Sequence, residues 1–96
     1  MIRHIVFFTV SEANFANARS GLERLGEIPH ANLFEVGVNL KRDLYGNEVD
    51  LVVYAEFRTV ADLDAYKAHP LYGEVTQAVR PLRNTRVAAD FESVEA

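Results

Sequence analysis

The hydrophobic pattern at the start of the chain is typical of a strand that is covered on both sides. Residues 2–10 read Ile-Arg-His-Ile-Val-Phe-Phe-Thr-Val, without glycine or proline. Because successive side chains of a strand point to opposite faces, His4 shares one face with Val6, and Phe7 lies on the other. Both faces are largely apolar, whereas a strand with one side in water would alternate. We therefore expect a covering layer on each side of this strand.

A helix is predicted next, followed by a short connector. Ser11 can cap its N-terminus, and Gly26 and Pro29 end it. Its apolar positions recur every three or four residues, which produces one stripe that would pack on the sheet. These positions are Phe15, Ala18, Leu22 and Leu25. His30, in the connector, is interpreted as a solvated loop residue.

Two alternating stretches then predict a hairpin. Residues 33–40 and 49–58 alternate in the way that half-buried strands do. The polar loop between them contains Tyr45-Gly46-Asn47, which is a turn signal. One face of the second stretch carries Leu51, Val53, Ala55 and Phe57.

A second helix and a last strand complete the pattern. Thr59 and Asp62 have the spacing of a capping box. The helix should break before Pro70, because proline disfavours helical geometry in the preceding residue, and Pro70 can begin a new segment. The inward positions of the two segments are Leu63, Tyr66, Leu71, Val75, Ala78 and Val79. Residues 85–92 form the last predicted strand.

This order of elements predicts an α+β fold of the split β-α-β type. The four-stranded antiparallel sheet would have its first and third strands in the centre and both helices on one face. The other face would expose Ile5, Phe7 and Val52 as an apolar patch. A second copy packed face to face would cover both patches, so we expect a homodimer that uses the sheet face opposite the helices.

Composition narrows the classes of partner. The 96 residues suffice for a single domain, residues 1–96. Ten basic and fourteen acidic residues produce a net charge of −4, which disfavours nucleic acid and anionic membranes as partners. The chain has no cysteine, which excludes disulfides and thiolate sites. With no recognisable signal peptide or membrane span, we expect a cytoplasmic protein.

Two groups of charged residues carry no recognisable site motif. Arg80, Arg83 and Arg86 are interpreted as a solvated helix end followed by a strand edge. The acidic residues do not have the spacing of a metal-binding loop, and the three histidines are far apart. We therefore expect no dedicated metal and no cofactor.

Four segments, taken in order, resemble one known family. They are the opening Met-Ile-Arg-His-Ile-Val-Phe-Phe, the connector Ile28-Pro29 leading into Phe34-Glu35-Val36-Gly37, Tyr66-Lys67-Ala68-His69-Pro70, and Val79-Arg80-Pro81-Leu82. Their order and spacing are similar to those of the stress-responsive dimeric α/β-barrel (Dabb) domain family, over essentially the whole chain. The resemblance implies a ferredoxin-like protomer and a homodimer that forms an α/β barrel.

The resemblance also bears on function. Some members of the family are polyketide cyclases, which close a linear polyketide by an aldol-type condensation in a pocket between helices and sheet. In these enzymes a histidine on the first strand and a histidine after the Tyr-x-x-His-Pro segment carry the acid/base chemistry. His4 matches the first of these positions. Tyr72 stands at the second, and Leu51 stands where cyclase-type members can have another histidine.

His4 is the main candidate for chemistry. If its face meets the helices, it looks toward Tyr66 and, more weakly, Tyr72. An imidazole with a pKa of about 6.5 can remove a proton from a carbon beside a carbonyl, while a phenol holds the enolate oxygen. The structural alternative is a hydrogen-bonded buried pair. His69 is interpreted as an N-cap residue and only weakly as a catalyst. The expected ligand-binding residues are Val6, Phe8, Phe15, Leu22, Leu63 and Tyr66.

Three functions remain open on this basis. The protein could be a stress-responsive protein that binds a small hydrophobic or aromatic ligand near His4. It could be a cofactor-free cyclase or lyase-type enzyme that uses His4 as acid and base. It could also be a structural or regulatory dimer without a ligand.

Overall fold

The computed structural model describes residues 1–95, and Ala96, the last residue of the predicted domain, lies outside the described residues. The elements, in chain order, are β1 (Ile2–Val10), α1 (Glu12–Glu23), the 3-10 helix η1 (Arg24–Glu27), β2 (Leu33–Val38), β3 (Leu51–Phe57), α2 (Val60–Ala68), α3 (Pro70–Val79) and β4 (Arg83–Glu92). The second predicted helix is thus two helices, α2 and α3, which meet at the expected proline.

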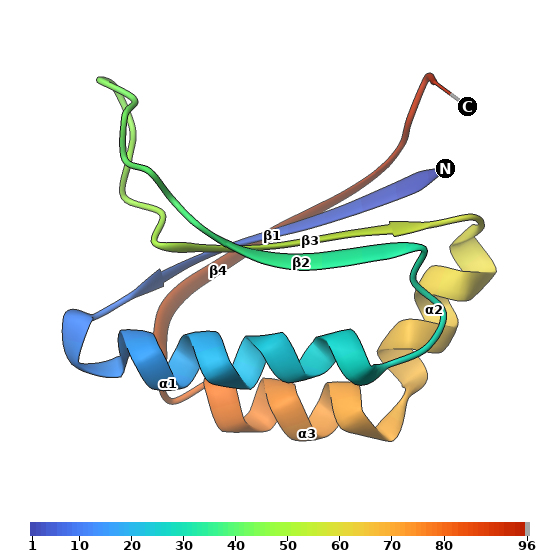
Figure 1. Ribbon diagram of the computed structural model, residues 1–96, viewed down its shortest axis with the longest axis horizontal. Coiled ribbons are helices and arrows are strands. Elements are labelled where there is room, and N and C mark those ends of the chain that lie inside the picture. The colour runs from blue at the N-terminus through green and yellow to red at the C-terminus, as the bar shows by residue number, and fades with distance from the viewer. Residues whose placement is uncertain (96) are drawn as a thin grey trace.

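The four strands form one antiparallel sheet in the order β2-β3-β1-β4. The first and third strands are central, as the pattern predicts. The helices lie together on one face of the sheet (Figure 1). On that face His4 lies between Ala55 of β3 and Asp90 of β4, which are its partners in the two registers. This α+β arrangement is the predicted ferredoxin-like protomer.

The hydrophobic core fills the space between the sheet and the helices. The predicted inward face of β3 is almost completely buried: Leu51, Val53, Ala55 and Phe57 are each at most 1 % exposed. From the helices, Ala18, Leu22, Tyr66 and Val75 are at most 2 % exposed. A Cβ atom at Gly21 would lie 3.0 Å from Val79 Cγ2, so this glycine is what lets α1 approach α3 closely.

The helix ends follow local signals in two places out of three. The Thr59 hydroxyl accepts a hydrogen bond from the Asp62 backbone N–H at 3.1 Å, and His69 Nδ1 accepts one from the Leu71 N–H at 3.1 Å. Both residues therefore cap as predicted. Ser11 stands at the N-cap of α1 with extended backbone, but its side chain makes no capping bond. The predicted helix start is therefore right, but the side-chain cap does not form, and only the Ser11 backbone carbonyl accepts a hydrogen bond, from the Asn14 N–H.

One predicted inward position of α3 is also wrong. Val75 and Val79 are buried, but Ala78 is exposed. The two valines are four residues apart and form a narrow stripe, and α3 packs against α1, α2 and η1. Ala78 lies beside this stripe, on the side of the helix that these elements leave uncovered.

The sheet face opposite the helices is bare in the protomer. Its central apolar side chains, Ile5, Phe7 and Val52, are half-buried, while Val87 is 63 % and Phe91 is 52 % exposed. Because Phe7 pairs with Val52 on one side and with Val87 on the other, these side chains are neighbours, and the predicted apolar patch is present on this face.

Within residues 1–95, no helix is long and apolar enough to span a membrane.

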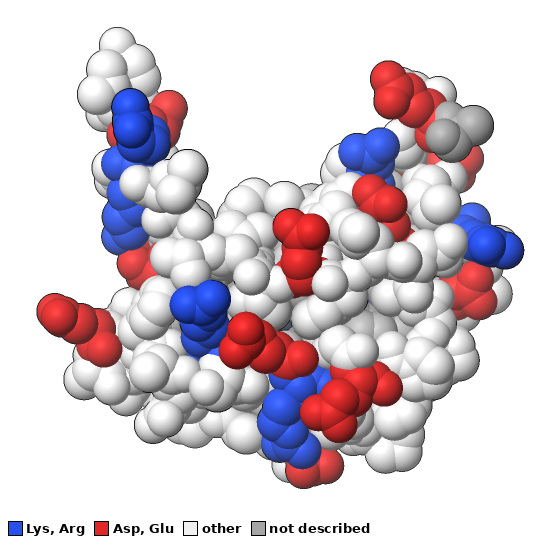
Figure 2. All heavy atoms as spheres, viewed as in Figure 1, with Lys and Arg blue, Asp and Glu red and all other residues white. Residues whose placement is uncertain are grey.

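Two projections flank this bare face (Figures 1 and 2). One is the β2–β3 connection, here called the hairpin arm (residues 39–50), and the other is the C-terminal segment. In the arm, the Asp43 carboxylate accepts from the backbone N–H groups of Tyr45 and Gly46 at 2.9 and 2.8 Å. Leu44 is nevertheless 88 % and Tyr45 95 % exposed. The arm therefore has an ordered turn but carries its large apolar side chains in the open.

Candidate functional site

His4 is a buried polar residue within the hydrophobic core, at 1 % exposure. Its position on central strand β1 places its ring against Phe57 and Tyr66, at centroid distances of 6.4 and 6.0 Å. Nδ1 donates a hydrogen bond to Asp90 Oδ1 on the neighbouring strand. Since Nδ1 carries the proton that it donates in this hydrogen bond, the neutral ring has its free lone pair on Nε2.

Burial, more than the charges around it, keeps His4 neutral. Burial lowers its pKa below the ordinary value of 6.5 and outweighs Asp90, which raises it, while Lys67 and Arg86 lower it further. Burial raises the pKa of Asp90, but its contacts with His4 and Lys67 outweigh burial and bring that pKa below its ordinary value. Lys67 Nζ lies 3.5 Å from Asp90 Oδ2. A neutral imidazole oriented by an ionised carboxylate can accept a proton.

Tyr66 supplies a second buried polar group beside His4. It is fully buried, and its hydroxyl has no hydrogen-bond partner among the described residues. Burial, aided by Tyr72, raises the pKa of Tyr66, so that the phenol stays protonated. An unpartnered buried hydroxyl costs about 1–3 kcal/mol, which a ligand oxygen at this position would offset.

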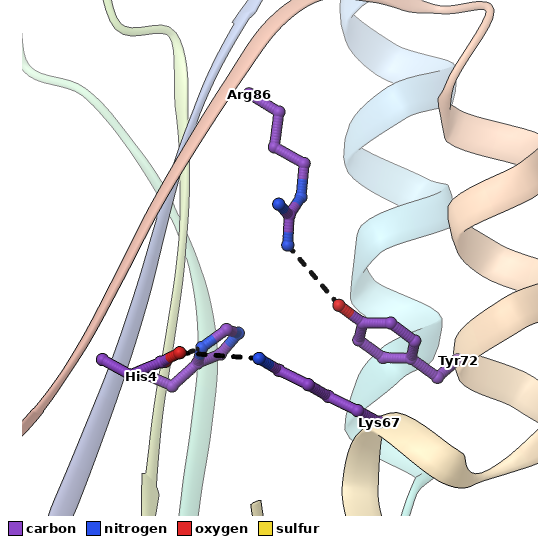
Figure 3. Close-up of polar contacts among 5 residues, drawn as sticks. His4, Lys67, Tyr72 and Arg86 are labelled. Atoms are coloured by element: carbon purple, nitrogen blue, oxygen red, sulfur yellow. Dashed lines mark hydrogen bonds and ion pairs between the residues drawn. The ribbon is translucent and has the colours of Figure 1, made fainter. Parts of the chain in front are cut away.

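Tyr72, from the start of α3, meets Arg86 of β4 across the gap between helices and sheet. Arg86 Nη2 donates to the Tyr72 hydroxyl at 3.5 Å, and the Tyr72 ring packs against Tyr66 at 5.4 Å between centroids. Figure 3 shows these two side chains pointing toward each other, with the imidazole of His4 projecting from the sheet toward the helices. Both layers therefore contribute polar groups to one site.

A cavity of about 250 Å³ lies between the sheet and the helices at this point. His4, Tyr66 and Tyr72 line it, together with the apolar side chains Val6, Phe8, Leu22, Leu25, Val53 and Val79 and the remaining residues Thr76, Arg80, Arg83 and Arg86. A concave, mostly apolar space with a few convergent polar groups is the usual form of a small-molecule site.

The cavity contains most, but not all, of the candidates from the sequence. The three aromatic candidates His4, Tyr66 and Tyr72 lie in it, as do Val6, Phe8 and Leu22. Phe15 and Leu63 do not line it. His69 is occupied in capping α3, which accords with its structural interpretation.

Sequence reasoning did not place in the site its four charged residues, Thr76, or the apolar residues Leu25, Val53 and Val79. Asp90 was counted only among the acidic residues that lack the spacing of a metal-binding loop, and the three arginines were interpreted as solvated. The available signal was the alternation of residues 85–92, which places Arg86 and Asp90 on the face opposite Val87. Which strand faces His4, however, depends on the register of β1 with β4.

A metal ion requires several histidine or acidic side chains close together. Within residues 1–95, no group of three or more histidine or acidic side chains is placed to hold a metal ion. The site is therefore described by its imidazole, phenol, carboxylate and guanidinium groups.

The family model named Dabb, stress responsive A/B barrel domain, matches residues 2–93 of this chain. The chain belongs to the Dabb family. The resemblance carried by the opening strand and the Tyr-x-x-His-Pro segment is thereby confirmed. No curated protein matches this Dabb chain.

Solved structures place the Dabb chain among ferredoxin-like proteins. A dimeric ferredoxin-like protein of unknown function from Thermobifida fusca is 24 % identical with a TM-score of 0.77, covering 94 % of this chain and 88 % of that chain. A dimeric protein of unknown function from Bacteroides fragilis is 22 % identical with a TM-score of 0.76, covering 96 % and 95 %. Hydroxynitrile lyase from Passiflora edulis is 20 % identical with a TM-score of 0.80, covering 99 % and 94 %. At these identities the likeness shows the fold.

Proposed function

We propose that this Dabb protein binds a small carbonyl compound in the cavity and that His4 removes a proton from the carbon beside the carbonyl group. The observation that carries the proposal is the hydrogen bond from His4 Nδ1 to Asp90. This bond leaves Nε2 as the basic atom of a residue that lines the cavity. The lowered pKa keeps the ring neutral, and therefore basic, at neutral pH.

The proton transfer has a defined electron balance. The C–H bond breaks, its proton moves to Nε2, and its electron pair enters the enolate, whose negative charge rests on oxygen. The protonated hydroxyl of Tyr66, which has no partner among residues 1–95, can donate to that oxygen. Hydrogen-bond donors placed where charge develops are among the largest contributors to catalysis.

The fate of the enolate depends on the substrate. Return of the proton from Nε2 to carbon produces isotope exchange in heavy water. If the same molecule has a second carbonyl, the enolate carbon attacks it, a C–C bond forms, and the new alkoxide takes the proton from Nε2. The second course is the cyclase-type reaction that the family resemblance implies.

Deuterium incorporation tests the proposal without knowledge of the natural substrate. The wild-type protein in heavy water should exchange the α-protons of acetophenone or of 1-phenylbutane-1,3-dione faster than buffer does, as followed by proton NMR. In His4→Asn the amide can still donate to Asp90 but no base remains. We expect the catalysed rate to fall by about 10²- to 10⁴-fold, the usual contribution of a positioned base.

His30→Asn is the matched control, because His30 is an exposed histidine outside the cavity. It should leave the exchange rate unchanged. Equal exchange in wild type and His4→Asn would contradict the proposal, as would exchange no faster than buffer across the ketone panel.

Binding without turnover is a second candidate, favoured by the apolar lining of the cavity. A ligand that binds only the folded state raises its stability, by about 2.7 kcal/mol at one hundred times Kd. Thermal stabilisation by a panel member without deuterium incorporation would support binding alone and overturn the enzymatic proposal. The absence of both effects would overturn both and support a structural or regulatory dimer.

We also infer that two copies of this chain pack through the bare sheet face. The exposed Val87 and Phe91 and the half-buried Phe7 support this, because such a contiguous apolar surface is unusual on a monomer. The relatives from Thermobifida fusca and Bacteroides fragilis are dimeric. The hollow between the hairpin arm and the C-terminal segment has room on this side for a second copy (Figure 2).

In this arrangement the exposed Leu44 and Tyr45 of the hairpin arm would lie against the flank of the partner subunit. Light scattering at micromolar concentration should give the mass of two chains. A single-chain mass under these conditions would contradict the dimer while leaving the proposal for His4 intact.

A further inference from the structure

Three arginines gather at the cavity, and within residues 1–95 no acidic side chain lines it. Arg80 follows the end of α3, while Arg83 and Arg86 belong to the first half of β4. We propose that the ligand of this cavity carries a carboxylate, which Arg83, Arg86 and Arg80 hold, so that the substrate class is a small aryl or acyl carboxylate with an enolisable carbonyl. The proposal rests on the function proposed above and adds the recognition group of the substrate.

The backbone directs two of these side chains to the cavity side of the sheet. Arg86 pairs with Phe8, whose buried side chain faces the helices. Toward the start of β4 the pairing register with β1 shifts by one residue. Thr85 pairs with Thr9, but the next residue of β1, Val10, pairs with Arg83, so that Asn84 is skipped. A shift of one residue reverses the face of a side chain, and bulges commonly serve this purpose beside active sites.

Without this bulge, Asn84 would pair with Val10 and Arg83 would point to the bare face. With it, Arg83 shares the face of buried Val10 and lines the cavity. The irregularity therefore adds a guanidinium to the site at the cost of a regular strand end.

Four of the seven other basic residues form ion pairs, whereas Arg3, Arg42 and Arg58 share with the cavity arginines the lack of one among residues 1–95. What sets Arg80, Arg83 and Arg86 apart is that all three line one cavity. Ion pairs join Arg19 to Glu23, Arg24 to Glu74, Lys41 to Asp50 and Lys67 to Asp90. Among the described residues, Arg80, Arg83 and Arg86 take part in no ion pair, although acidic residues outnumber basic ones by fourteen to ten. The single side-chain hydrogen bond of this group joins Arg86 to Tyr72.

The chemistry and the size of the cavity point to a carboxylate on a small molecule. Guanidinium groups bind planar carboxylates through two parallel hydrogen bonds. The volume of about 250 Å³ lies below the usual range for ligand pockets, so it suits one ring or a short acyl chain rather than a nucleotide. At the other side of such a ligand, the unpartnered hydroxyl of fully buried Tyr66 would meet its carbonyl oxygen.

Calorimetric titration with 3-phenylpropanoate and with its neutral amide tests the carboxylate directly. These probes need no enolisation, so the result does not depend on His4. The wild type should bind the carboxylate at least about tenfold more tightly than the amide, since hydrogen bonds between charged groups are stronger than those to a neutral amide. In the double variant Arg83→Gln/Arg86→Gln this preference should largely vanish, while affinity for the amide stays the same.

Arg58→Gln is the matched control, because Arg58 is an exposed arginine outside the cavity. It should keep the full preference. Equal affinity of wild type for the two probes would overturn the inference, as would an undiminished preference in the double variant or no binding of either probe at millimolar concentration. Inorganic phosphate that displaces 3-phenylpropanoate at equal concentration would assign the arginines to phosphate and also overturn it.

The two proposals fail separately. A carboxylate preference that persists in His4→Asn, combined with no deuterium exchange in wild type, would sustain the recognition site and overturn the base. Deuterium exchange that depends on His4, combined with equal affinity for carboxylate and amide, would sustain the base and overturn the recognition site. Circular dichroism of each variant verifies that the fold is retained.

Discussion

The two faces of the sheet are built from the same strands and both carry large apolar side chains, yet they have different environments. On the helix side Val53 is 1 % exposed, whereas its neighbour Val52 on the other side remains half-buried. The covered face is buried by helices of the same chain, and part of it, including His4, lines the cavity. The bare face combines a large apolar surface with a few polar side chains, among them Tyr54, whose hydroxyl donates to Glu56 at 2.5 Å. Under the proposals above, the covered face would serve binding and the bare face would serve assembly.

The largest expected effect comes from the covered face. Phe57 is fully buried and packs against Tyr66 at 5.1 Å between ring centroids. Phe57→Ala should lower the free energy of unfolding by about 3–5 kcal/mol, because it removes buried apolar area and leaves a cavity. Urea unfolding followed by circular dichroism at fixed protein concentration measures this. Phe57→Leu should lose less than half as much, and a loss below about 1 kcal/mol in Phe57→Ala would contradict the burial.

A charge on the bare face should act on assembly rather than on folding. Val87→Glu would place a charge, once per subunit, in the proposed interface, where an unpaired buried charge costs several kcal/mol. We expect the dimer dissociation constant to rise by at least about 30-fold, measured by analytical ultracentrifugation over a range of concentrations.

Val60→Glu is the control for this variant, since Val60 is 57 % exposed on helix α2 rather than on the bare face. It should remain as dimeric as wild type. If both variants dissociate to the same degree, or neither does, the bare face is not the interface.

The hairpin arm should contribute less than the sheet face. Leu44 and Tyr45 are almost fully exposed in the protomer, and partial burial of such side chains contributes about 1–2 kcal/mol. Leu44→Ser/Tyr45→Ser should therefore weaken the dimer roughly tenfold. The free energy of unfolding of the dissociated chain should not change. A variant that dimerises as tightly as wild type would remove the arm from the interface.

The smallest effect is a pH dependence that belongs to the covered face. The folded state holds His4 with a pKa below 6.5, so between that lowered pKa and 6.5 the unfolded chain binds the additional proton. The contribution of His4 to stability is therefore fully present above pH 6.5 and is lost as the pH falls toward the lowered pKa. Urea unfolding at pH 7.0 and pH 5.5 should show this loss in wild type and not in His4→Asn.

Asp90→Asn sharpens the same test. Asp90 raises the pKa of His4, so its removal should lower that pKa further and extend the pH-dependent window to more acidic values. The pH profile of deuterium exchange should shift in the same direction, which identifies Asp90 as a positioning residue for His4. Glu92→Gln on the same strand should shift neither profile. A profile that moves to higher pH in Asp90→Asn would contradict the assigned role.

Much of the fold followed from local patterns in the sequence. The period of two in residues 2–10 defines strand β1 with the observed bounds, and Thr59 and Pro70 mark helix starts where the structure has them. Such signals act over a few residues, because periodicity and capping depend on neighbours in the chain. The apolar face opposite the helices likewise follows from these patterns, whereas the family resemblance comes from four particular segments of the sequence.

The site was decided by the tertiary structure. His4 and Asp90 are 86 positions apart, and they meet only because β4 pairs with β1 in one particular register. The same register, shifted by a bulge, turns Arg83 toward the cavity beside Arg86. No local pattern encodes that register, since it depends on strand pairing and on the turns that set it. The sequence alone thus determined the strand that carries His4, and the fold determined the carboxylate and the guanidinium groups that surround it.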